Sequence, residues 1–421
     1  MAILKPEIAS PKQDKPAAIA VRDVVDYELL FDCVHCGLCL ESCPTYIITR
    51  AEMDSPRGRI YLMKGLAEGR LELDGDVVRH LDLCLECRGC ETACPSGVRY
   101  GRLIEHARGY IERNWRRGVV ERLRNRIIRT MFPYPARLRA ALAPLRFAER
   151  IGVRRLLRRL SPTSARGWLD LLPDLSREQG PLIQANLHPE DGKELNESSS
   201  APSAVVHHGC VAQVLTESAN INSERALAAA GYRVVRLAKT ACCGALDIHH
   251  GNLERAREFA RINVAALAAS GADSIISAAS GCSAVIAQYG ELLKDDSKLA
   301  VQAREVSARV ADLSSLLLRR RHTESSSLPA PASHPHLASP VAAGKSGGAS
   351  RVTVTYHDSC HLVHGLGVRE QPRELLRSIP GVNLVELAES DLCCGSAGSY
   401  NLTEQTMARE LARRKVDNII A

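Results

Sequence analysis

Residues 33–44 read Cys33-Val-His-Cys36-Gly-Leu-Cys39-Leu-Glu-Ser-Cys43-Pro44, and residues 84–95 repeat the pattern as Cys84-Leu-Glu-Cys87-Arg-Gly-Cys90-Glu-Thr-Ala-Cys94-Pro95. Three cysteines at this spacing can turn inward onto one compact iron–sulfur cluster, whereas the fourth, which precedes a proline, is directed to a second cluster. The two copies therefore predict two [4Fe-4S] clusters that exchange their fourth ligands. The first is expected on Cys33, Cys36, Cys39 and Cys94, and the second on Cys84, Cys87, Cys90 and Cys43.

Zinc is the alternative metal for a cysteine-rich pattern, but zinc sites commonly use two separated Cys-x-x-Cys pairs. Four cysteines in each run, a trailing proline and a full repeat favour iron–sulfur ligation. We expect Gly37 and Gly89, which lack side chains, to let the backbone wrap closely and to offer amide donors to cluster sulfurs. An apolar stripe follows Pro56, so helices and not a small sheet are expected between the runs.

The chain has 421 residues, enough for two or three domains with separate cores. Its amino terminus lacks the apolar segment of a secretory signal, so the 15 cysteines are expected to be thiols in the reducing cytoplasm. No window approaches the roughly 20 apolar residues that cross a bilayer. Any contact with the inner face of the cell membrane is therefore expected to be peripheral. Because no GxGxxG or P-loop motif occurs, neither a flavin nor an NAD site is expected in this chain.

Composition and patterning divide the chain into seven predicted segments. They are a flexible arm (residues 1–20), an α-helical domain with both cysteine runs (21–112), an Arg-rich helical segment (113–175), a linker (176–203), a first α/β module (204–321), a low-complexity linker in which 20 of 29 residues are Ser, Ala, Pro or Gly (322–350), and a second module (351–421).

The Arg-rich segment carries the basic charge of the chain. Sixteen Arg and two Glu lie between Arg113 and Arg166, a local balance of +14 in a chain of net charge +7. Its apolar spacing predicts short amphipathic helices separated by prolines, namely Pro133, Pro135, Pro144 and Pro162. We favour basic faces that cover a partner's helices over a membrane-surface role, and both stay open. Nucleic acid is not expected as a partner, because no nucleic-acid-binding module accompanies the basic residues.

Alternating strand and helix patterns end twice at a Cys-Cys-Gly (CCG) motif. The first module runs from residue 204 through Cys242-Cys243-Gly244 to a strand that spans Asp273 to Cys282, and the second repeats the pattern up to Cys393-Cys394-Gly395. Such alternation predicts a parallel sheet in each copy. The second copy is predicted to be truncated, because the sequence stops before any counterpart of the strand that leads to Cys282.

The modules contain seven candidates for a further metal or redox site, namely Cys210, Cys242, Cys243, Cys282, Cys360, Cys393 and Cys394. Adjacent cysteines cannot easily bridge each other, so a thiolate cage or redox-active site is favoured over ordinary buried cysteines. The second module has only three thiols, which could hold a cluster with an open or non-cysteine fourth position. No catalytic residue is expected. The histidines at 207, 208, 249 and 250 are expected at most to support neighbouring groups.

These features together resemble the iron–sulfur subunit of glycolate oxidase. The stretches that carry the resemblance, besides the cysteine runs, are Ser55-Pro-Arg-Gly-Arg-Ile-Tyr-Leu-Met-Lys64, His207-His-Gly-Cys210, Ala241-Cys-Cys-Gly-Ala245 and Leu392-Cys-Cys-Gly-Ser-Ala-Gly-Ser-Tyr400. The same layout occurs in the iron–sulfur subunit of anaerobic glycerol-3-phosphate dehydrogenase, lactate-utilisation proteins and heterodisulfide reductase subunits. The resemblance implies a multidomain protein: an α-helical ferredoxin domain with two [4Fe-4S] clusters, then a duplicated α/β (CCG) cysteine-rich domain.

The resemblance also implies partners and a role. Flavin-bearing glycolate oxidase subunits would oxidise glycolate to glyoxylate and pass electrons through this chain toward a quinone or membrane acceptor. The alternatives are a heterodisulfide or thiol reductase subunit, or an iron–sulfur subunit for another 2-hydroxy acid or for glycerol 3-phosphate. A sensor or scaffold is a third class. Heterodisulfide-type modules end in Cys-x-x-Cys, whereas Val285 stands at the final position here, which argues against a cluster bound as in that family.

Overall fold

The computed structural model describes residues 24–150, 201–237, 240–323, 352–396 and 398–421. The predicted arm lies outside these residues, and so do most of both predicted linkers.

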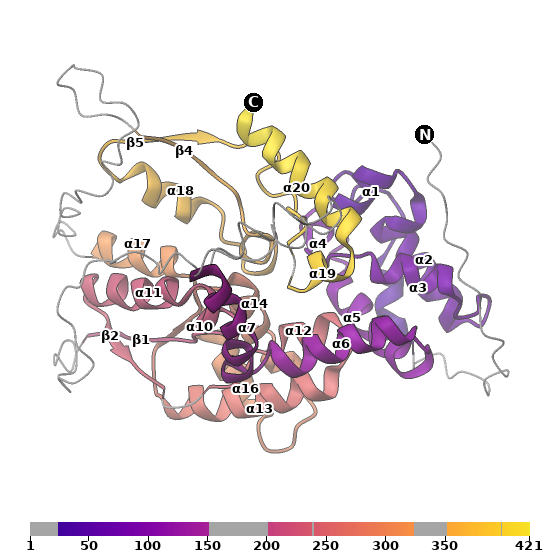
Figure 1. The fold of residues 1–421 in the computed structure, drawn as a ribbon, viewed down its shortest axis with the longest axis horizontal. Helices are drawn as coiled ribbons and strands as arrows, with labels where there is room; N and C mark the ends of the chain where they lie inside the picture. The colour runs from indigo at the N-terminus through magenta and orange to yellow at the C-terminus, as the bar shows by residue number, and fades with distance from the viewer. Residues whose placement is uncertain (1–23, 151–200, 238–239, 324–351, 397) are drawn as a thin grey trace. The chain divides into compact units, whose positions relative to one another are not determined.

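The chain divides into two compact units (Figure 1, coloured by residue number). The first unit consists of Met1–Arg117, Ile248–Leu253 and Asp391–Ala421, and the second of Gly118–Asp247 and Glu254–Ser390. The residues of the predicted second module are thus divided between the two units. The segment boundaries themselves stay a prediction.

Helices build the described part of the first unit, as expected from the stripe after Pro56. Its elements are η2 (Tyr27–Asp32), α1 (Pro44–Thr49), η3 (Glu52–Asp54), α2 (Pro56–Ala67), α3 (Gly75–Asp82), α4 (Gly89–Thr92), α5 (Tyr100–Asn114), α19 (Tyr400–Thr403) and α20 (Gln405–Ile420). Helix α2 starts where a proline occupies its first position and the Ser55 hydroxyl accepts the amide of Gly58 at 2.9 Å. Asp74 caps α3 in the same way, at 2.9 Å from the amide of Val77.

The core of the first unit lies among α2, α3 and α5. Met63, Leu81, Leu103, Ile104 and Ile111 have no exposed surface. Each such side chain stabilises the fold by roughly 1.5–3 kcal/mol relative to an exposed one. The helices are therefore held together mainly by apolar burial, and the cysteine runs lie in the connections between them.

The last helices of the chain belong to this first unit. Helix α20 packs on α1, which follows the first cysteine run directly. The Tyr400 hydroxyl donates a hydrogen bond to the carbonyl of Leu83 at 2.8 Å, one residue before Cys84. Residues more than 300 positions apart thus build one unit.

A parallel three-stranded sheet forms in the second unit, in the order β2-β1-β3 (Figure 1). Its strands are β1 (Ser203–Val206), β2 (Arg233–Val235) and β3 (Ser274–Ile276), with α11 (Glu217–Ala229) and α13 (Leu253–Ala269) in the crossovers. Ala204, Val205 and Ile275 are completely buried. This confirms the alternating strand and helix pattern predicted for the first module.

One strand prediction was too long. We expected the strand from Asp273 to extend to Cys282, but β3 ends at Ile276 and Cys282 lies in a helix, α14 (Ser280–Ile286). The reason is that only Ile275 and Ile276 are β-branched, whereas the following Ser, Ala and Gly residues have little side chain to pack on a sheet. The remaining helices of this module are α10 (Ala212–Leu215), α12 (Ala245–His249), α15 (Tyr289–Leu292), α16 (Ala300–Ala308) and α17 (Leu313–Thr323).

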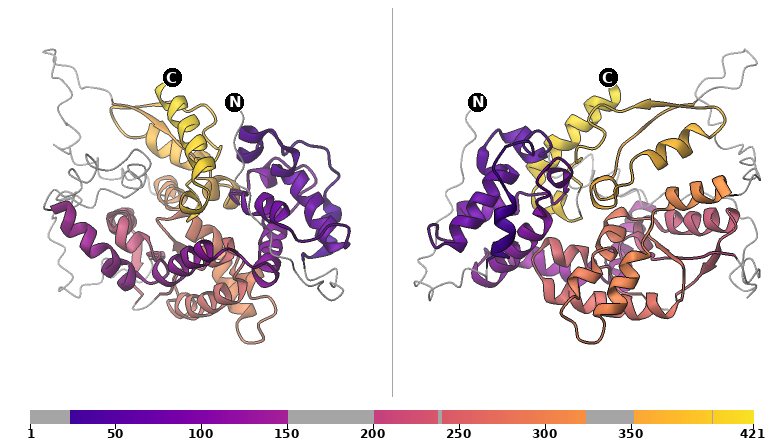
Figure 2. Two further views of the ribbon diagram at one scale, coloured as in Figure 1. Left: turned by 45° about the vertical axis from the view of Figure 1, so that its right-hand side comes forward. Right: turned by 180° about the vertical axis from the view of Figure 1, so that it is seen from behind.

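A second sheet follows, with two parallel strands, β4 (Val352–Tyr356) and β5 (Val382–Glu386). Helix α18 (Glu370–Arg377) connects them and packs against β5 (Figure 2), and the π-helical turn η4 (His361–Gly365) follows β4. The expected strand-helix-strand order of the second copy is confirmed. Among the described residues this sheet has no third strand, and truncation of the copy stays a prediction.

The Arg-rich segment forms two described helices, α6 (Val119–Met131) and α7 (Pro135–Arg150). The predicted break at Pro133 and Pro135 is confirmed, but the predicted break at Pro144 is wrong, because α7 continues through it. The run Ala140-Ala-Leu-Ala143 before this proline consists of strong helix formers, which offset the loss of one backbone hydrogen bond. Pro162 lies outside the described residues. In the part of the chain that the structure describes, no helix combines the length and apolar character needed to cross a bilayer.

Candidate iron–sulfur site

The two cysteine runs adopt the same backbone turn. In the first run His35 and Gly37 have φ values of 56° and 87°, and in the second Glu86 and Arg88 have φ values of 54° and 64°. These residues stand two and four positions after the first cysteine of each run. Left-handed residues in such a loop turn successive N–H groups toward one point, which is how backbone nests receive anions and iron–sulfur clusters.

The glycines of the two runs differ in conformation. Gly37 is left-handed, with a φ of 87° that favours glycine. In the second run Arg88 takes the left-handed conformation, and Gly89 begins α4. The expected close wrapping and amide donation by both glycines stay a prediction.

The first run borders a hollow together with the last cysteine of the second run. This hollow is lined by Cys33, Cys36, Cys39 and Cys94, with Val34, Leu38, Val98 and other residues between them. Cys36 is exposed and the other three thiols are half-buried. Val34 and Leu38 are 68% and 61% exposed, so this hollow lies at the surface of its unit.

The second run borders another hollow together with the last cysteine of the first run. This hollow is lined by Cys43, Cys84, Cys87 and Cys90. Cys43, Cys84 and Cys90 are buried and Cys87 is half-buried. The structure therefore brings together the two groups of four cysteines that the spacing predicts, and places the second group deeper than the first.

The two hollows are neighbours, because Pro56, Cys90 and Tyr100 line both. Tyr100 is buried, and its hydroxyl donates to the Cys84 sulfur at 3.8 Å. Pro56 at the start of α2 and Tyr100 at the start of α5 therefore lie between the two groups of thiols.

The donor set and size of each hollow fit a [4Fe-4S] cluster. The four predicted ligand thiols line each hollow, and Cys90 borders the first as well. The empty space, open to solvent, is about 410 Å³ at the first run and 350 Å³ at the second. Among the described residues, no three His, Cys, Asp or Glu side chains converge on a single metal-ion position; the sulfurs of each run border an open space instead. Thiolates are the ligands that such clusters use.

Burial keeps several of these thiols protonated in the absence of metal. It raises the pKa of Cys39 to about 11 and that of Cys90 well above the usual range. Cluster binding requires thiolates, so iron must displace these protons, and loading should release protons to solvent.

A buried charge network holds the second cysteine loop. Glu86, between Cys84 and Cys87, is 4% exposed and contacts Arg108 at 2.9 Å and His249 at 2.7 Å. Burial alone would raise the pKa of Glu86, but His249 and Arg108 lower it to about 2. Arg108 also donates to the carbonyl of Cys84 at 2.5 Å. The network therefore clamps the backbone of this loop.

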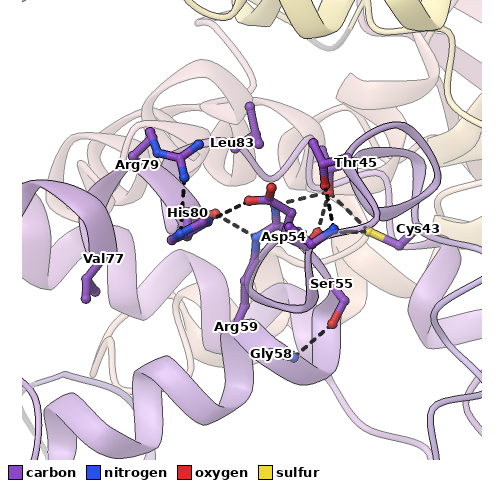
Figure 3. Close-up of polar contacts among 12 residues, drawn as sticks. Cys43, Thr45, Asp54, Ser55, Gly58, Arg59, Val77, Arg79, His80 and Leu83 are labelled. Atoms are coloured by element: carbon purple, nitrogen blue, oxygen red, sulfur yellow. Dashed lines mark hydrogen bonds and ion pairs between the residues drawn. The ribbon is translucent and has the colours of Figure 1, made fainter. Parts of the chain in front are cut away.

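Two arginines on the first turn of α2 reach different hollows. Arg57 lines the first hollow and donates to the carbonyl of His35 at 3.1 Å. Arg59 lines the second, and Figure 3 shows its guanidinium directed toward Cys43 and Thr45. Both arginines belong to the stretch Ser55–Lys64. The sequence predicted a helix there, but it did not indicate that these side chains would line the hollows.

The first CCG module brings four cysteines together. The sulfur of Cys210 lies 3.3 Å from that of Cys242, and the sulfur of Cys243 lies 3.2 Å from that of Cys282. Hydrogen bonds from Cys243 and His207 lower the pKa of Cys282 to about 6, although burial opposes this. A hydrogen bond from Cys210 also lowers the pKa of Cys242 well below the usual range. Four adjoining thiols, two of them readily ionised, can bind a soft metal or undergo thiol–disulfide chemistry.

The glycine of each CCG motif makes the same close approach. Gly244 and Gly395 have φ values of 92° and 83°. A Cβ on Gly244 would lie 3.3 Å from Ala256 of α13, and one on Gly395 would lie 2.7 Å from the carbonyl of Ala408 of α20. Only glycine fits both positions, which supports the internal duplication.

The three cysteines of the second copy do not share a unit. Cys360 belongs to the second unit, whereas Cys393 and Cys394 belong to the first. The histidines have local partners: His207 with the carbonyl of Ala241, His208 with Glu224, His249 with Glu86, and His250 with Ser399. The partner of His207 directly precedes Cys242, and the partner of His249 lies between Cys84 and Cys87.

Comparison with known proteins agrees with this architecture. Residues 30–98 match the family model of a 4Fe-4S dicluster domain, and residues 204–287 and 354–421 match that of a cysteine-rich domain. Residues 120–177 match the model of the linker region of the glycolate oxidase iron–sulfur subunit. The fold and site thus define an iron–sulfur electron-transfer protein with two CCG regions.

Curated relatives cover most of the chain. It is 34% identical over 417 residues to the probable glycolate oxidase iron–sulfur subunit of Bacillus subtilis (97% of this chain, 88% of the relative). It is 32% identical over 392 residues to the glycolate oxidase iron–sulfur subunit of Escherichia coli (92% and 84%). The chain belongs to the family of glycolate oxidase iron–sulfur subunits. A more distant relative, 26% identical over 407 residues (95% of this chain, 66% of the relative), is one of the subunits of the CoM/CoB fumarate reductase of Methanothermobacter marburgensis. No solved structure matches the chain significantly.

Proposed function

We propose that this chain is the electron-transfer subunit of a glycolate dehydrogenase complex. It receives electrons from flavin-bearing subunits that oxidise glycolate to glyoxylate, and passes them toward a quinone. The observation that carries the proposal is the pair of neighbouring four-thiol hollows that share Pro56, Cys90 and Tyr100. The names of the relatives supply the substrate.

The chemistry requires a relay between two-electron partners. Oxidation of glycolate releases an electron pair and two protons, flavin accepts the pair, and quinone takes up a pair with two protons. Iron–sulfur clusters supply one-electron transfer when bound. In this chain, three cysteines of one run and the last cysteine of the other would hold each cluster, and the backbone nests and buried arginines around them would receive its negative charge.

We assign the first cluster to Cys33, Cys36, Cys39 and Cys94, and the second to Cys43, Cys84, Cys87 and Cys90. The shared hollows support this assignment. Iron and acid-labile sulfide counts on the anaerobically reconstituted chain test it. About eight of each per chain are expected, and a count near four would leave room for one cluster alone.

The substrate is tested on the native complex. The complex is isolated by affinity capture of the tagged chain, and reduction of an artificial dye is followed with glycolate, lactate and glycerol 3-phosphate. Fastest reduction with glycolate is expected. Reduction only with lactate or glycerol 3-phosphate would assign the chain to one of those dehydrogenases, and a capture without flavin would contradict the proposed partners.

The four thiols of the first CCG module support a second candidate function, thiol or disulfide reduction. Their sulfur contacts of 3.2 and 3.3 Å suit either an additional cluster or paired redox thiols. A heterodisulfide or thiol reductase predicts that adding a thiol substrate changes the spectrum of a centre at these cysteines. An unchanged spectrum, with full turnover of glycolate, favours the electron-transfer role alone.

Helix α6 supports a peripheral contact with an anionic membrane surface. Val119, Leu123 and Ile127, at successive turns, are 72%, 58% and 48% exposed, and exposed Arg122 and Arg126 lie beside them. An apolar stripe bordered by arginines is what an interfacial helix presents to anionic lipid. Sedimentation with phosphatidylserine vesicles should decrease in Leu123→Ser but not in the control Ile262→Ser, an exposed apolar residue of α13. Binding to neither lipid vesicles nor membranes would point to a protein partner instead.

A further inference from the structure

We propose that Arg59 sets the reduction potential of the second cluster, the one expected on Cys43, Cys84, Cys87 and Cys90, and that it does so through a buried charge that no ion pair balances. The inference rests on the proposed two-cluster function. It concerns a residue of this chain that no family match assigns.

Arg59 is held rigidly beside the second hollow. Its side chain is 1% exposed. The guanidinium donates from Nε to the carbonyl of His80 at 2.7 Å, from Nη2 to the Thr45 hydroxyl at 3.0 Å, and from Nη1 toward the Cys43 sulfur at 3.9 Å (Figure 3). Three directed contacts leave the charge fixed on the side of the hollow that Cys43 occupies.

No carboxylate in the described residues lies within ion-pair distance of this guanidinium. Asp54, the acidic group among these polar contacts, is hydrogen-bonded to His80 at 2.7 Å and acts on Arg59 electrostatically without forming an ion pair with it (Figure 3). Burial of a cation that no ion pair balances is unfavourable. The site therefore calls for negative charge, and the thiolates that line the hollow, with the cluster they bind, supply it.

Arg57 provides the contrast within the same turn of α2. Its guanidinium makes two bonds to the Glu52 carboxylate, 2.8 Å from Nε and 3.1 Å from Nη2, and its side chain is 29% exposed. Its charge is thus balanced by Glu52 and screened by solvent. Of two arginines that reach the two hollows, only Arg59 brings an unbalanced charge.

An unbalanced positive charge favours the reduced state of a cluster. A thiolate-bound cluster is anionic and gains one more negative charge on reduction, so a nearby cation stabilises the reduced form and raises the potential. Burial has the opposite effect, because removal from water penalises the more highly charged form. The thiols of the second hollow are more buried than those of the first, so burial disfavours reduction of the second cluster more strongly. The charge of Arg59 offsets this effect of burial.

The test is an EPR-monitored redox titration of the full-length, reconstituted chain. Cys87→Ser identifies the signal of the second cluster and Cys36→Ser that of the first. Arg59→Met and Arg59→Gln remove the charge, and Arg59→Lys retains it. We expect both neutral variants to shift the second cluster to a lower potential and leave the first unchanged, and the lysine variant to stay near the parent value.

Each result decides the matter. An unshifted second cluster in a neutral variant that retains about eight iron overturns the inference, while the iron count itself upholds the two-cluster function. Equal shifts in the lysine and neutral variants would show a packing effect and also overturn it. Loss of the second cluster from both neutral variants would also overturn the inference, because the charge would then act on cluster binding and not on the potential.

Discussion

The hydroxyl of Tyr400 donates to the backbone carbonyl of Leu83 at 2.8 Å, so a residue near the second CCG motif holds the stretch of chain that enters the second cysteine run. Tyr400 is 7% exposed and Leu83 is 8% exposed. The bond therefore forms away from water, where an unsatisfied carbonyl is costly.

Removal of this hydroxyl should destabilise the first unit. Tyr400→Phe keeps the ring and leaves the Leu83 carbonyl without this donor, so the free energy of unfolding is expected to fall by about 1–3 kcal/mol in urea titration. Tyr61→Phe is the control, because Tyr61 is half exposed, and should change stability by less than about 0.5 kcal/mol. Equal losses of unfolding free energy in the two variants would mean that the buried hydrogen bond does not stabilise the first unit.

Exchange of the fourth ligands predicts a crossed pattern of cluster loss. Cys43→Ser should perturb the cluster that is lost in Cys87→Ser, and Cys94→Ser should perturb the one lost in Cys36→Ser, because these pairs line the same hollows. EPR and iron counts on the four variants measure this. If Cys43→Ser instead affected the centre of Cys36, each run would hold its own cluster.

Arg373 should be essential for the second sheet. It is 4% exposed and donates to both carboxylate oxygens of Asp358, at 2.8 and 2.7 Å, and to Glu386 at 2.9 Å. Arg373→Met leaves Asp358 buried without its cation, and a loss of about 3–5 kcal/mol in unfolding free energy is expected. Arg377 binds the same Glu386 from an exposed position, so the control Arg377→Met should cost about 1 kcal/mol or less. Similar losses would show that burial of the pair is unimportant.

Asp247 should make the second unit less stable as pH rises. Burial raises the pKa of Asp247 to about 6, and the nearby charges of Arg255, in contact at 3.6 Å, and of Arg129 oppose this increase only in part. Because the folded pKa lies above the unfolded value, the stabilisation is complete below about pH 4 and is lost as pH passes through 6. Asp247→Asn should therefore be more stable than the parent at pH 7, by up to about 3 kcal/mol, and equal to it near pH 4.

The difference between the two proteins in urea midpoints across this pH range is the measurement. Asp295→Asn, at an exposed position, serves as control and should show no such divergence. A parent-minus-variant difference that does not change between pH 4 and 7 would contradict the assignment.

Cys282 should ionise at a lower pH than an ordinary thiol. Its pKa, lowered to about 6 by Cys243 and His207, predicts rapid alkylation by iodoacetamide at pH 7 in the metal-free chain. His207→Gln should move the reaction to higher pH, and peptide mapping identifies the labelled site. Labelling of Cys282 that is slow at pH 7, or unaltered by the His207 substitution, would refute this.

Local patterns sufficed for the features that depend on spacing. Cysteine spacing predicted which thiols share a hollow, and β-branched runs such as Val205 and Ile275 predicted the first sheet. They failed for the end of the first sheet, which lies before Cys282. Where a strand ends depends on packing against neighbouring elements, which no local pattern records.

Long-range partners could not be predicted at all. Tyr400 contacts Leu83, and His249 contacts Glu86, although each pair is far apart in the sequence. Such contacts form only when the chain folds, so no local pattern indicates them. Arg59 is a similar case, since an arginine on an amphipathic helix is ordinarily solvated, and only its observed burial shows otherwise. The chemistry of the cysteines is therefore readable from the chain, but the charges that act on it are not.

The membership of α19 and α20 in the first unit has a consequence for biosynthesis. The cysteine runs leave the ribosome early, but the helices that complete their unit follow much later, since Tyr400 lies 317 positions after Leu83. The nascent chain thus exposes the eight thiols of the two runs before these helices emerge, so assembly of the metal centres in the cell should follow their emergence and depend on factors that shield the thiols until then.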